Sequence, residues 1–349
     1  MDTQKLSSVD AFVVRDLPDA ERSVGAVRVA PKILAAGAKE MARSMTYRYA
    51  LLNRTIGGAS AGINAKPDAR AEAIAAFSAE LLPHVTDGTL HIDATGAVPS
   101  EALAGLQAAD HRNDIRLTLV QNTIFADRLG GLGAHAAADE ALGGVGAMKD
   151  QRVVIEGFGT TGPTLAAAAV AYGAKVVAVS TARGSVGRAE GFDPLELIQA
   201  HAAHGAEFVQ HLGEEAKPAN HVMSHECDVF YAGSKMGVIN HTAAEFLNTR
   251  VLVPTGPVPY TTKAVLMLQE KGCMVLPDFM TTAGSTFAEW AAGDADVAAI
   301  EEEATTSIRQ LTSAIIGPEH GPTLEACYRA ESHLRSWRET LPFGRPFAA

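Results

Sequence analysis

The middle of the chain alternates between short apolar runs and longer segments with apolar residues at helical spacing. Five apolar runs predict buried parallel strands, at Arg152–Glu156, Lys175–Ser180, Val229–Ala232, Val251–Val253 and Met274–Leu276. Four helices are expected between them, at Pro163–Tyr172, Pro194–His201, Thr242–Leu247 and Thr262–Lys271. Strands that alternate with helices predict an α/β fold, in which helices cover both faces of a parallel sheet.

The first third of the chain has a less regular pattern. Apolar positions at helical spacing predict a helix over Lys32–Leu51, and the Asp after Pro67 starts a second helix over Asp68–Leu82. Between these helices, Gly57–Gly62 is expected to form a glycine-rich turn. A short strand is expected in the run LHIDATG, and further helices are expected at 101–110, 121–143 and Val297–Leu341.

Length and composition restrict the class of protein. A chain of 349 residues with 47% hydrophobic and 20% charged residues is typical of a globular protein of about two domains. Its net charge of −11, without a Lys/Arg stripe, disfavours binding to nucleic acid. Three cysteines without a CxxC pair suit a reducing compartment. Because there is no signal-peptide pattern and no apolar run of about 18 residues, we expect a cytoplasmic protein with no membrane partner.

A glycine motif stands between the first predicted strand of the alternating region and its helix. It reads Gly157-Phe158-Gly159-Thr160-Thr161-Gly162. In a GxGxxG turn the first glycine permits the tight bend, the second lets the backbone approach a pyrophosphate, and the third lets helix and strand pack closely. The strand, turn, helix and strand that surround the motif support a dinucleotide site over an ordinary glycine turn.

The residues after the second strand bear on which nicotinamide cofactor binds. An Asp or Glu there would bind the ribose 2′-hydroxyl of NAD, whereas this chain has Ser180-Thr181-Ala182-Arg183. Two hydroxyls and a guanidinium can bind a 2′-phosphate, so Ser180, Thr181 and Arg183 favour NADP over NAD. The alternative is that Arg183 is a solvated loop charge.

Histidines are frequent between His201 and His241. His221 and His225 are four residues apart and would share a helix face, as some metal ligands do. No HExxH motif or Cys/His spacing accompanies them, so solvated or capping histidines are the expectation and no metal site is predicted.

Eight segments between Val24 and Trp290 are informative in combination. They are VGAVRVAP, MTYRYALLNRTIGGASAGI, GLGAHAAADEALGG, RVVIEGFGTTG, KVVAVSTARG, CDVFYAGSKMGVI, LVPTGPVPYTTKAVLMLQEKG and MVLPDFMTTAGSTFAEW. In this order they resemble the glutamate/leucine/phenylalanine/valine dehydrogenase family. The resemblance implies an α/β substrate and oligomerisation domain at 1–135, a Rossmann-like NAD(P)-binding domain at 136–305, and C-terminal helices at 306–349 that return to the first domain.

The resemblance also assigns roles to residues outside the glycine motif. Arg48 stands where the family has a Lys that binds the substrate carboxylate, and a guanidinium can bind a carboxylate through two hydrogen bonds. Asp93 matches the catalytic Asp of the family and is the candidate general acid/base; the alternative is an Asp that caps a turn. The implied cofactor loops contain Ala232, Gly233, Thr255, Gly256 and Pro257.

Other positions depart from the family pattern. Ser60 falls where the family has its catalytic Lys, and Thr282 and Pro257 fall where it has Asn. Loss of one preorganised electrostatic donor costs about 3–4 kcal/mol of transition-state stabilisation, so ordinary oxidative deamination should be poor. Ser60, Thr282 and Arg48 are expected to bind a different substrate.

We therefore expect an NAD(P)-dependent oxidoreductase that transfers hydride to or from a C=N or C=O carbon of an amino-acid-like or other acidic small molecule. Two alternatives are a conventional amino acid dehydrogenase with rearranged catalytic groups and a non-catalytic, cofactor-binding regulatory protein. The family resemblance implies a homodimer or a higher homo-oligomer.

Overall fold

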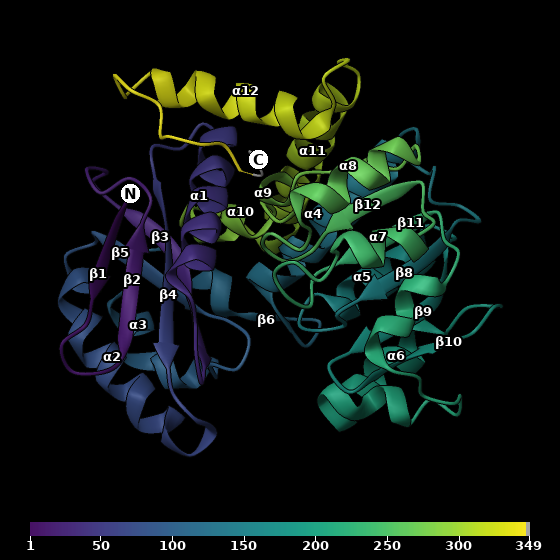
Figure 1. Cartoon of the computed structure of the whole chain (residues 1–349), viewed down its shortest axis with the longest axis horizontal. Coiled ribbons are helices and arrows are strands. Elements are labelled where there is room, and N and C mark those ends of the chain that lie inside the picture. The colour runs from purple at the N-terminus through teal and green to yellow at the C-terminus, as the bar shows by residue number, and fades with distance from the viewer. Residues whose placement is uncertain (347–349) are drawn as a thin grey trace. The chain divides into compact units, whose positions relative to one another are not determined.

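The structure is a computed structural model that describes residues 1–346, and the chain divides into two compact units (Figure 1). The first unit consists of Met1–Arg112 together with residues 327–346, and the second consists of Asn113–Ala326. These borders differ from the expected ones after residues 135 and 305. The cause is helix α4 (Phe125–Leu142), which packs against α5 (Gly162–Ala171) and α11 (Val297–Ile316) and so belongs to the second unit.

The first unit contains a five-stranded sheet in the order β1-β2-β4-β3-β5. Its strands are β1 (Asp2–Lys5), β2 (Ala11–Arg15), β3 (Ser23–Ala30), β4 (Gly57–Asn64) and β5 (Leu90–Ala94). Strands β4, β3 and β5 are parallel, while β1 and β2 continue the sheet in antiparallel pairing. The carboxyl ends of three strands therefore share one edge.

The two faces of this sheet carry different helices. One face packs on α2 (Arg70–Thr86) and α3 (Ala104–Ala109) through a core that includes Val27, Ala61, Ile63, Phe77 and Ile92. On the other face, α1 (Ala35–Leu51) covers β2 and β4, where Phe12 and Val14 pack with Ala38 and Ala42. Helix α12 (Pro322–Arg335) crosses the border between the units in the sequence.

Residues Gly57–Gly62 form part of β4, so the expected glycine turn is wrong. A Cβ on Gly58 would lie 1.9 Å from the Ala42 carbonyl oxygen of α1, and one on Gly62 would lie 2.8 Å from the Phe12 ring. Gly58 therefore allows α1 to pack closely on the strand, and Gly62 leaves room for the Phe12 ring of β2. A buried strand made of small residues therefore has the composition of a turn.

The second unit contains a six-stranded sheet in the order β10-β9-β8-β11-β12-β13. Its strands are β8 (Arg152–Glu156), β9 (Lys175–Thr181), β10 (Gly184–Gly187), β11 (Val229–Ala232), β12 (Val251–Pro254) and β13 (Met274–Val275). All pairs are parallel except β10 with β9. Successive residues Val153, Val154 and Ile155 are fully buried, which requires cover on both faces.

The predicted alternation of strands and helices in the second unit is confirmed, and the helix and strand bounds shift by only a few residues. Its other helices are α6 (Pro194–His204), α7 (His241–Phe246), α8 (Thr262–Glu270), α9 (Asp278–Thr281) and α10 (Ser285–Glu289). A small ribbon joins β6 (Leu119–Val120) to β7 (Thr123–Ile124). Short 3-10 helices are η1 (Pro67–Ala69), η2 (Ser100–Leu103), η3 (Asp114–Leu117), η4 (Gly205–Gln210) and η5 (Ala219–Ser224).

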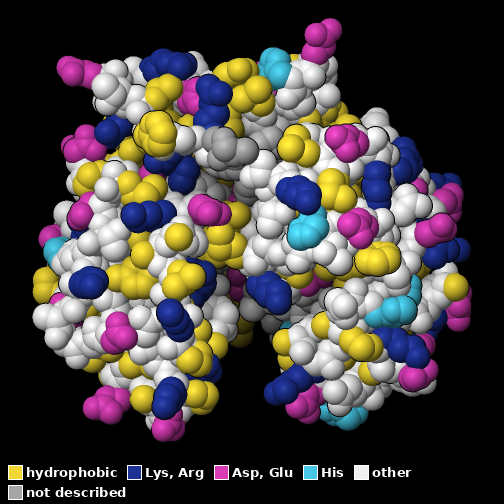
Figure 2. All heavy atoms as spheres, in the orientation of Figure 1, with side chains coloured by type: hydrophobic (Ala, Val, Ile, Leu, Met, Phe, Trp, Pro, Cys, Tyr) yellow, Lys and Arg dark blue, Asp and Glu magenta, His cyan; other side chains and the backbone are white. Residues whose placement is uncertain are grey.

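Surface charge is mixed on the face that Figure 2 shows, where Lys and Arg side chains lie among acidic and apolar ones. Within residues 1–346, no helix combines the length and the apolar character needed to cross a membrane.

Candidate functional site

The turn after β8 has the geometry that the glycine motif predicts. Gly157 has a φ of +80°, and a Cβ added there would lie 2.5 Å from the Ser234 backbone nitrogen. A Cβ on Gly162 would lie 2.6 Å from the Phe158 ring. By contrast, a Cβ on the exposed Gly159 would meet only the Gly157 carbonyl oxygen, at 3.8 Å. The turn is closely packed at both ends and open at its centre.

The open centre leads into helix α5. Thr160 is exposed, and Thr161 precedes the helix without capping it through its side chain. Because α5 runs for ten residues away from the turn, the positive end of its dipole faces the turn. This combination of an open glycine and a helix N-terminus suits a phosphate group.

The loops after β11 and β12 meet at the same edge of the sheet. The Thr255 N–H donates to the Ala232 carbonyl at 2.8 Å, and a Cβ on Gly233 would lie 2.2 Å from Thr255 Oγ1. A Cβ on Gly256, which precedes Pro257, would lie 2.6 Å from the Gly233 carbonyl oxygen. The structure thus brings together the predicted cofactor residues that follow three different strands.

Glu156 joins two of these loops and was not singled out in the sequence. It is the last residue of β8 and is buried, and its Oε2 accepts hydrogen bonds from the N–H groups of Gly233 and Ser234, both at 3.1 Å. The chain leaves β8 toward β9 and leaves β11 toward β12, on opposite sides, so a crevice is expected between β8 and β11. Glu156 spans that point.

The predicted 2′-phosphate residues at the end of β9 have different surroundings. Ser180 Oγ accepts a hydrogen bond from the Gly157 N–H at 3.3 Å, and Thr181 Oγ1 donates to the Ala206 carbonyl at 2.6 Å. Both hydroxyls therefore already form hydrogen bonds with backbone groups of the protein. Arg183 is exposed, and its Nε lies 3.8 Å from a carboxylate oxygen of the exposed Glu207, an ion pair that contributes little in water.

In the first unit, strand register brings two candidate catalytic residues together. Ala26 of β3 pairs with Ser60 of β4 on one side and with Asp93 of β5 on the other. Ala61 and Ile92, the sequence neighbours of Ser60 and Asp93, point into the α2 side of the sheet, so Ser60 and Asp93 point to the opposite face. With strands about 5 Å apart, the Cα atoms of Ser60 and Asp93 are about 10 Å apart, across the half-buried Ala26.

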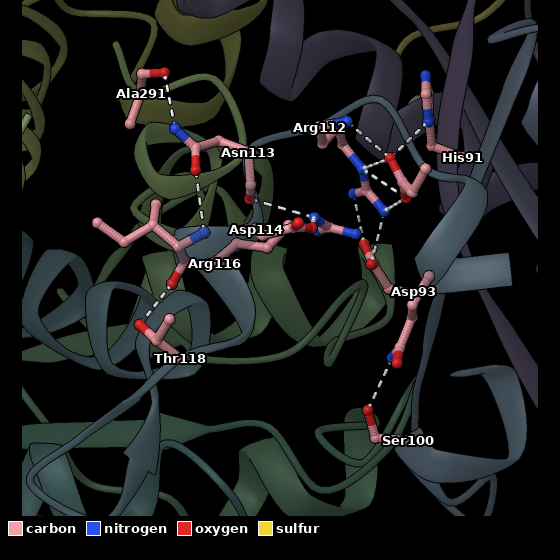
Figure 3. A network of polar contacts seen from close by, with 12 residues as sticks. His91, Asp93, Ser100, Arg112, Asn113, Asp114, Arg116, Thr118 and Ala291 are labelled. Atoms are coloured by element: carbon pink, nitrogen blue, oxygen red, sulfur yellow. Dashed lines mark hydrogen bonds and ion pairs between the residues drawn. The ribbon is translucent and has the colours of Figure 1, made fainter. Parts of the chain in front are cut away.

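Asp93 is the accessible end of a chain of ionic hydrogen bonds (Figure 3). Its two oxygens accept from Arg112 Nη1 at 2.8 Å and from Nη2 at 2.7 Å. Arg112 also donates to Asp110, from Nη2 at 2.7 Å and Nε at 3.1 Å, and Asp110 Oδ1 lies 2.8 Å from His91 Nδ1. The side chains of Arg112, Asp110 and His91 are 0–3% exposed, whereas that of Asp93 is 42% exposed.

The buried part of this network favours charge on Asp110. Burial alone would raise its pKa, but the hydrogen bonds from His91 and Arg112 and the charge of Arg112 outweigh burial and hold the pKa well below its usual value. The neighbouring sequence, Asp110-His111-Arg112, shows charged residues but gives no sign that they meet β5. A contact between residues 93 and 112 depends on the fold and was not predicted.

Arg48 lies on α1, which runs antiparallel to β4. Gly62 packs near Ile33, before the helix starts, and Gly58 packs near Ala42 and Thr46. Arg48 therefore lies toward the beginning of β4, beyond Gly58, and it is buried. Arg28 of β3 is a second cation on the face that carries Ser60 and Asp93, since it stands two residues after Ala26. Burial lowers the pKa of Arg28.

Thr282 belongs to the second unit, at the C-terminal end of α9, where its Oγ1 donates to the Asp278 carbonyl at 2.6 Å. His221 and His225 lie in and just after η5, with ring centroids 5.6 Å apart in an edge-to-face arrangement. In the part of the chain that the structure describes, no three His, Cys, Asp or Glu side chains gather as a metal site would require.

Comparisons with known proteins agree with this architecture. Residues 126–318 match the family model described as Glutamate/Leucine/Phenylalanine/Valine dehydrogenase. The chain is 28% identical over 179 residues to an NADP-specific glutamate dehydrogenase of Saccharolobus shibatae, a match that covers 50% of this chain and 42% of that protein. It is 28% identical over 166 residues to an NAD-specific glutamate dehydrogenase of Staphylococcus aureus, covering 47% and 40% of the two chains. The match thus spans less than half the length of either relative.

Solved structures share the fold at low sequence identity. Hetero-hexameric glutamate dehydrogenase from Thermus thermophilus, in its Leu-bound form, has a TM-score of 0.76 with 19% identity, covering 93% of this chain and 83% of that one. L-tryptophan dehydrogenase from Nostoc punctiforme has a TM-score of 0.62 with 15% identity, covering 96% and 95%. Because the family model covers more than half of the sequence, this chain belongs to the glutamate/leucine/phenylalanine/valine dehydrogenase family.

Proposed function

We propose that this chain is an NAD(P)-dependent oxidoreductase that transfers hydride to or from the C=N or C=O carbon of an amino-acid-like or other acidic small molecule. The observation that carries the proposal is the glycine turn after β8. Its centre, Gly159, has free space where a Cβ would be, while Gly157, Gly233 and Gly256 pack against neighbouring backbone.

This turn fits a dinucleotide. Gly159 and Thr160 are exposed at the N-terminus of α5, so Gly157–Gly162 would hold the pyrophosphate, with Ala232–Gly233 and Thr255–Pro257 along the same sheet edge. When bound, the nicotinamide cofactor supplies or accepts the hydride. The residues of this chain orient it: Glu156 and Ser180 fix the surrounding loops through hydrogen bonds to backbone N–H groups.

On the first unit, Ser60 and Asp93 provide the polar groups of the substrate site. The Ser60 hydroxyl would donate a hydrogen bond to the carbonyl oxygen or imine nitrogen, and Asp93 would exchange a proton at that same atom. Arg48 would bind the acidic group of the substrate, and the Thr282 hydroxyl is proposed as a further substrate contact. The row formed by Ser60, Ala26 and Asp93 supports this assignment, since both polar groups flank one small residue.

A serine at position 60 bears on which substrates are used. A hydroxyl cannot supply the positive charge of the family's Lys, and one such donor contributes about 3–4 kcal/mol to transition-state stabilisation. The proposed enzyme therefore acts best on a preformed imine or on a carbonyl that does not require attack by ammonia. Reduction of simple 2-keto acids that rises strongly with ammonia would instead indicate a conventional amino acid dehydrogenase.

We propose NADP as the preferred cofactor, with Arg183 as the 2′-phosphate contact. The relatives include both an NADP-specific and an NAD-specific enzyme, so they support either cofactor. Residues 180–183 contain no carboxylate that would repel a 2′-phosphate. The ion pair between Arg183 and Glu207 is long and exposed, so a phosphate would readily replace Glu207 as the partner of Arg183. Ser180 and Thr181 would support the loop through their bonds to Gly157 and Ala206.

Fluorescence titration with NADPH and NADH tests the proposal. We expect NADPH to bind at least tenfold more tightly, and Arg183→Ala to remove most of that difference while NADH binding stays unchanged. Absence of binding to either cofactor at millimolar concentration would contradict the oxidoreductase and favour a different role for the fold. A screen of 2-keto acids and cyclic imines with NADPH, with and without ammonia, then identifies the substrate class.

We also infer a cytoplasmic homo-oligomer. The three cysteines are free and buried, which suits a reducing compartment. The Thermus thermophilus structure with the same fold is described as hetero-hexameric, which supports assembly of this chain as well. Light scattering on the purified protein measures its mass, and a monomer at micromolar concentration would contradict the inference.

A further inference from the structure

The network that ends at Asp93 is unusual in where its charges lie. Arg112, Asp110 and His91 are buried, and only Asp93 is accessible. Burial of charged side chains costs free energy even when they are paired, and well-packed apolar residues in the same place often stabilise a fold equally or more. Stability alone therefore does not explain why a chain of three buried polar groups ends at one accessible carboxylate.

The geometry constrains Asp93 fully. Arg112 Nη1 and Nη2 each donate to a different oxygen of Asp93, at 2.8 and 2.7 Å, so the plane of the carboxylate must align with the guanidinium. The guanidinium is itself fixed from behind, because Asp110 Oδ2 accepts from its Nε and Nη2. Asp110 cannot turn, since its Oδ1 accepts from the Arg112 backbone N–H at 2.9 Å and lies 2.8 Å from His91 Nδ1.

We propose that Asp110 and Arg112, supported by His91, are positioning residues that fix the carboxylate of Asp93 toward the substrate. This rests on the proposed function as far as the catalytic role of Asp93 is concerned. The oxygens of Asp93 keep lone pairs that Arg112 does not use, its side chain is 42% exposed, and Asp93 stands in the row that contains Ala26 and Ser60. A small displacement of such a group reduces turnover without weakening binding.

The test compares Asp110→Asn and Arg112→Lys with a matched control, Arg188→Lys. Arg188 also bridges two carboxylates, since its Nε donates to Glu214 at 2.6 Å and its Nη1 to Glu196 at 2.7 Å, but it lies in the second unit after β10. We expect Asp110→Asn and Arg112→Lys to lower kcat at least tenfold on a substrate from the screen. In these two variants, KM and NADPH affinity should stay within twofold of the wild-type values. Arg188→Lys should leave kcat, KM and NADPH affinity unchanged. Asp110→Asn that folds and keeps wild-type kcat would overturn the proposal.

A second measurement does not depend on turnover. Carbodiimide with glycine ethyl ester modifies accessible carboxyl groups, and peptide mass spectrometry gives the rate at Asp93. In the wild type, both oxygens of Asp93 are held by Arg112. Labelling of Asp93 should therefore be slower than labelling of other carboxyl groups with a similar exposure. Asp110→Asn should accelerate it at least fivefold, while Arg188→Lys should not. An unchanged rate would overturn the positioning role, whereas absence of wild-type turnover on every keto acid and imine would count against the proposed function only.

Discussion

The two candidate sites are constructed from different parts of the polypeptide. At the edge formed by β8, β11 and β12, the backbone makes the site: Gly157, Gly233 and Gly256 allow three loops to touch, and Gly159 leaves space. On the face formed by β3, β4 and β5, side chains make the site, and its accessible carboxylate is held by the buried Arg112, which the buried side chain of Asp110 holds in turn. The first depends on the absence of side-chain volume, and the second depends on charge.

This difference leads to opposite sensitivities. A methyl group added at Gly157 or Gly256 would displace backbone, because its nearest backbone neighbour would lie 2.5–2.6 Å away. Removal of one charge from the Asp93 network leaves another charge buried without compensation. Substitutions at each site can separate the dependence on volume from the dependence on charge.

Arg112→Met should destabilise the first unit by about 3–5 kcal/mol, because it leaves the Asp110 side chain, which is only 3% exposed, with a carboxylate charge and without its main partner. The chain has two tryptophans, Trp290 in the second unit and Trp337 in the first. Urea unfolding of a Trp290→Phe background, followed by Trp337 fluorescence, therefore reports on the first unit.

Arg335→Met is the matched control in the same unit. Arg335 Nη2 is 3.6 Å from Glu331 and its side chain is 60% exposed, so its loss should change the free energy of unfolding by less than about 0.5 kcal/mol. Equal effects of the two substitutions would show that the Asp93 network is no more important for folding than a surface pair.

The network shows what the sequence could not predict. Asp93 was identified through its resemblance to a family segment, but its role stays a prediction. Its partners Arg112 and Asp110 come after a helix that packs on the opposite face of the sheet, so no local pattern connects them to β5. Strand β4 was also missed, because Gly58, which lets α1 pack closely, and Gly62, which leaves room for the Phe12 ring, give the segment the composition of a turn.

Gly157→Ala should destabilise the second unit by about 2–4 kcal/mol and abolish measurable NADPH binding. A left-handed conformation costs a non-glycine residue about 1–2 kcal/mol, and the new Cβ would meet the Ser234 backbone at 2.5–2.6 Å.

Gly159→Ala is the informative counterpart, since its Cβ would meet nothing closer than 3.8 Å. Gly159→Ala should leave the urea midpoint equal to that of the wild type within the measurement error, and it should still weaken NADPH binding at least tenfold. Unchanged NADPH affinity of Gly159→Ala would place the cofactor elsewhere.

This edge was predictable because its determinants are contiguous. Six consecutive residues between a strand and a helix contain all three glycines of the motif, and the structure confirms the strand, turn and helix around them. Glu156, immediately before the motif, was missed because its function requires the N–H groups of Gly233 and Ser234, which lie 77 and 78 residues away in sequence.

Acid should destabilise the second unit more strongly than the first, where burial also lowers the pKa of His333. Burial lowers the pKa of His135, in α4, to about 4. Between pH 6.5 and 4 the unfolded chain binds this proton and the folded chain does not, so stability falls as pH falls, by about 2 kcal/mol at pH 5. The lowered pKa of Asp110 acts at lower pH, because an acid of this kind stabilises the fold above its ordinary value of 3.8 and loses that contribution only below it.

Urea unfolding at pH 7.5 and pH 5 measures this difference, with Trp337→Phe to follow the second unit and Trp290→Phe to follow the first. His135→Gln should remove most of the pH dependence of the second unit, because no titrating group is left at that position. A first unit that weakens as much as the second over this range would contradict the assignment of acid sensitivity to His135.

The smallest expected effect concerns thiols and leaves stability unchanged. Burial raises the pKa of Cys227 and of Cys273 to about 12, three pH units above the ordinary thiol value of 9.0, so their thiolate fraction at pH 7.5 is about a thousandfold lower. Both belong to the second unit, whereas Cys327 is a buried residue of the first. Under native conditions at pH 7.5, none of the three should react with a disulfide reagent during the time in which free cysteine is consumed.

A buried thiol reacts only when its surroundings open. Mass spectrometry at low urea identifies the cysteine that is labelled first and so shows which unit opens more easily. Rapid native labelling of Cys227 would contradict its burial and make it a candidate reactive residue near β11.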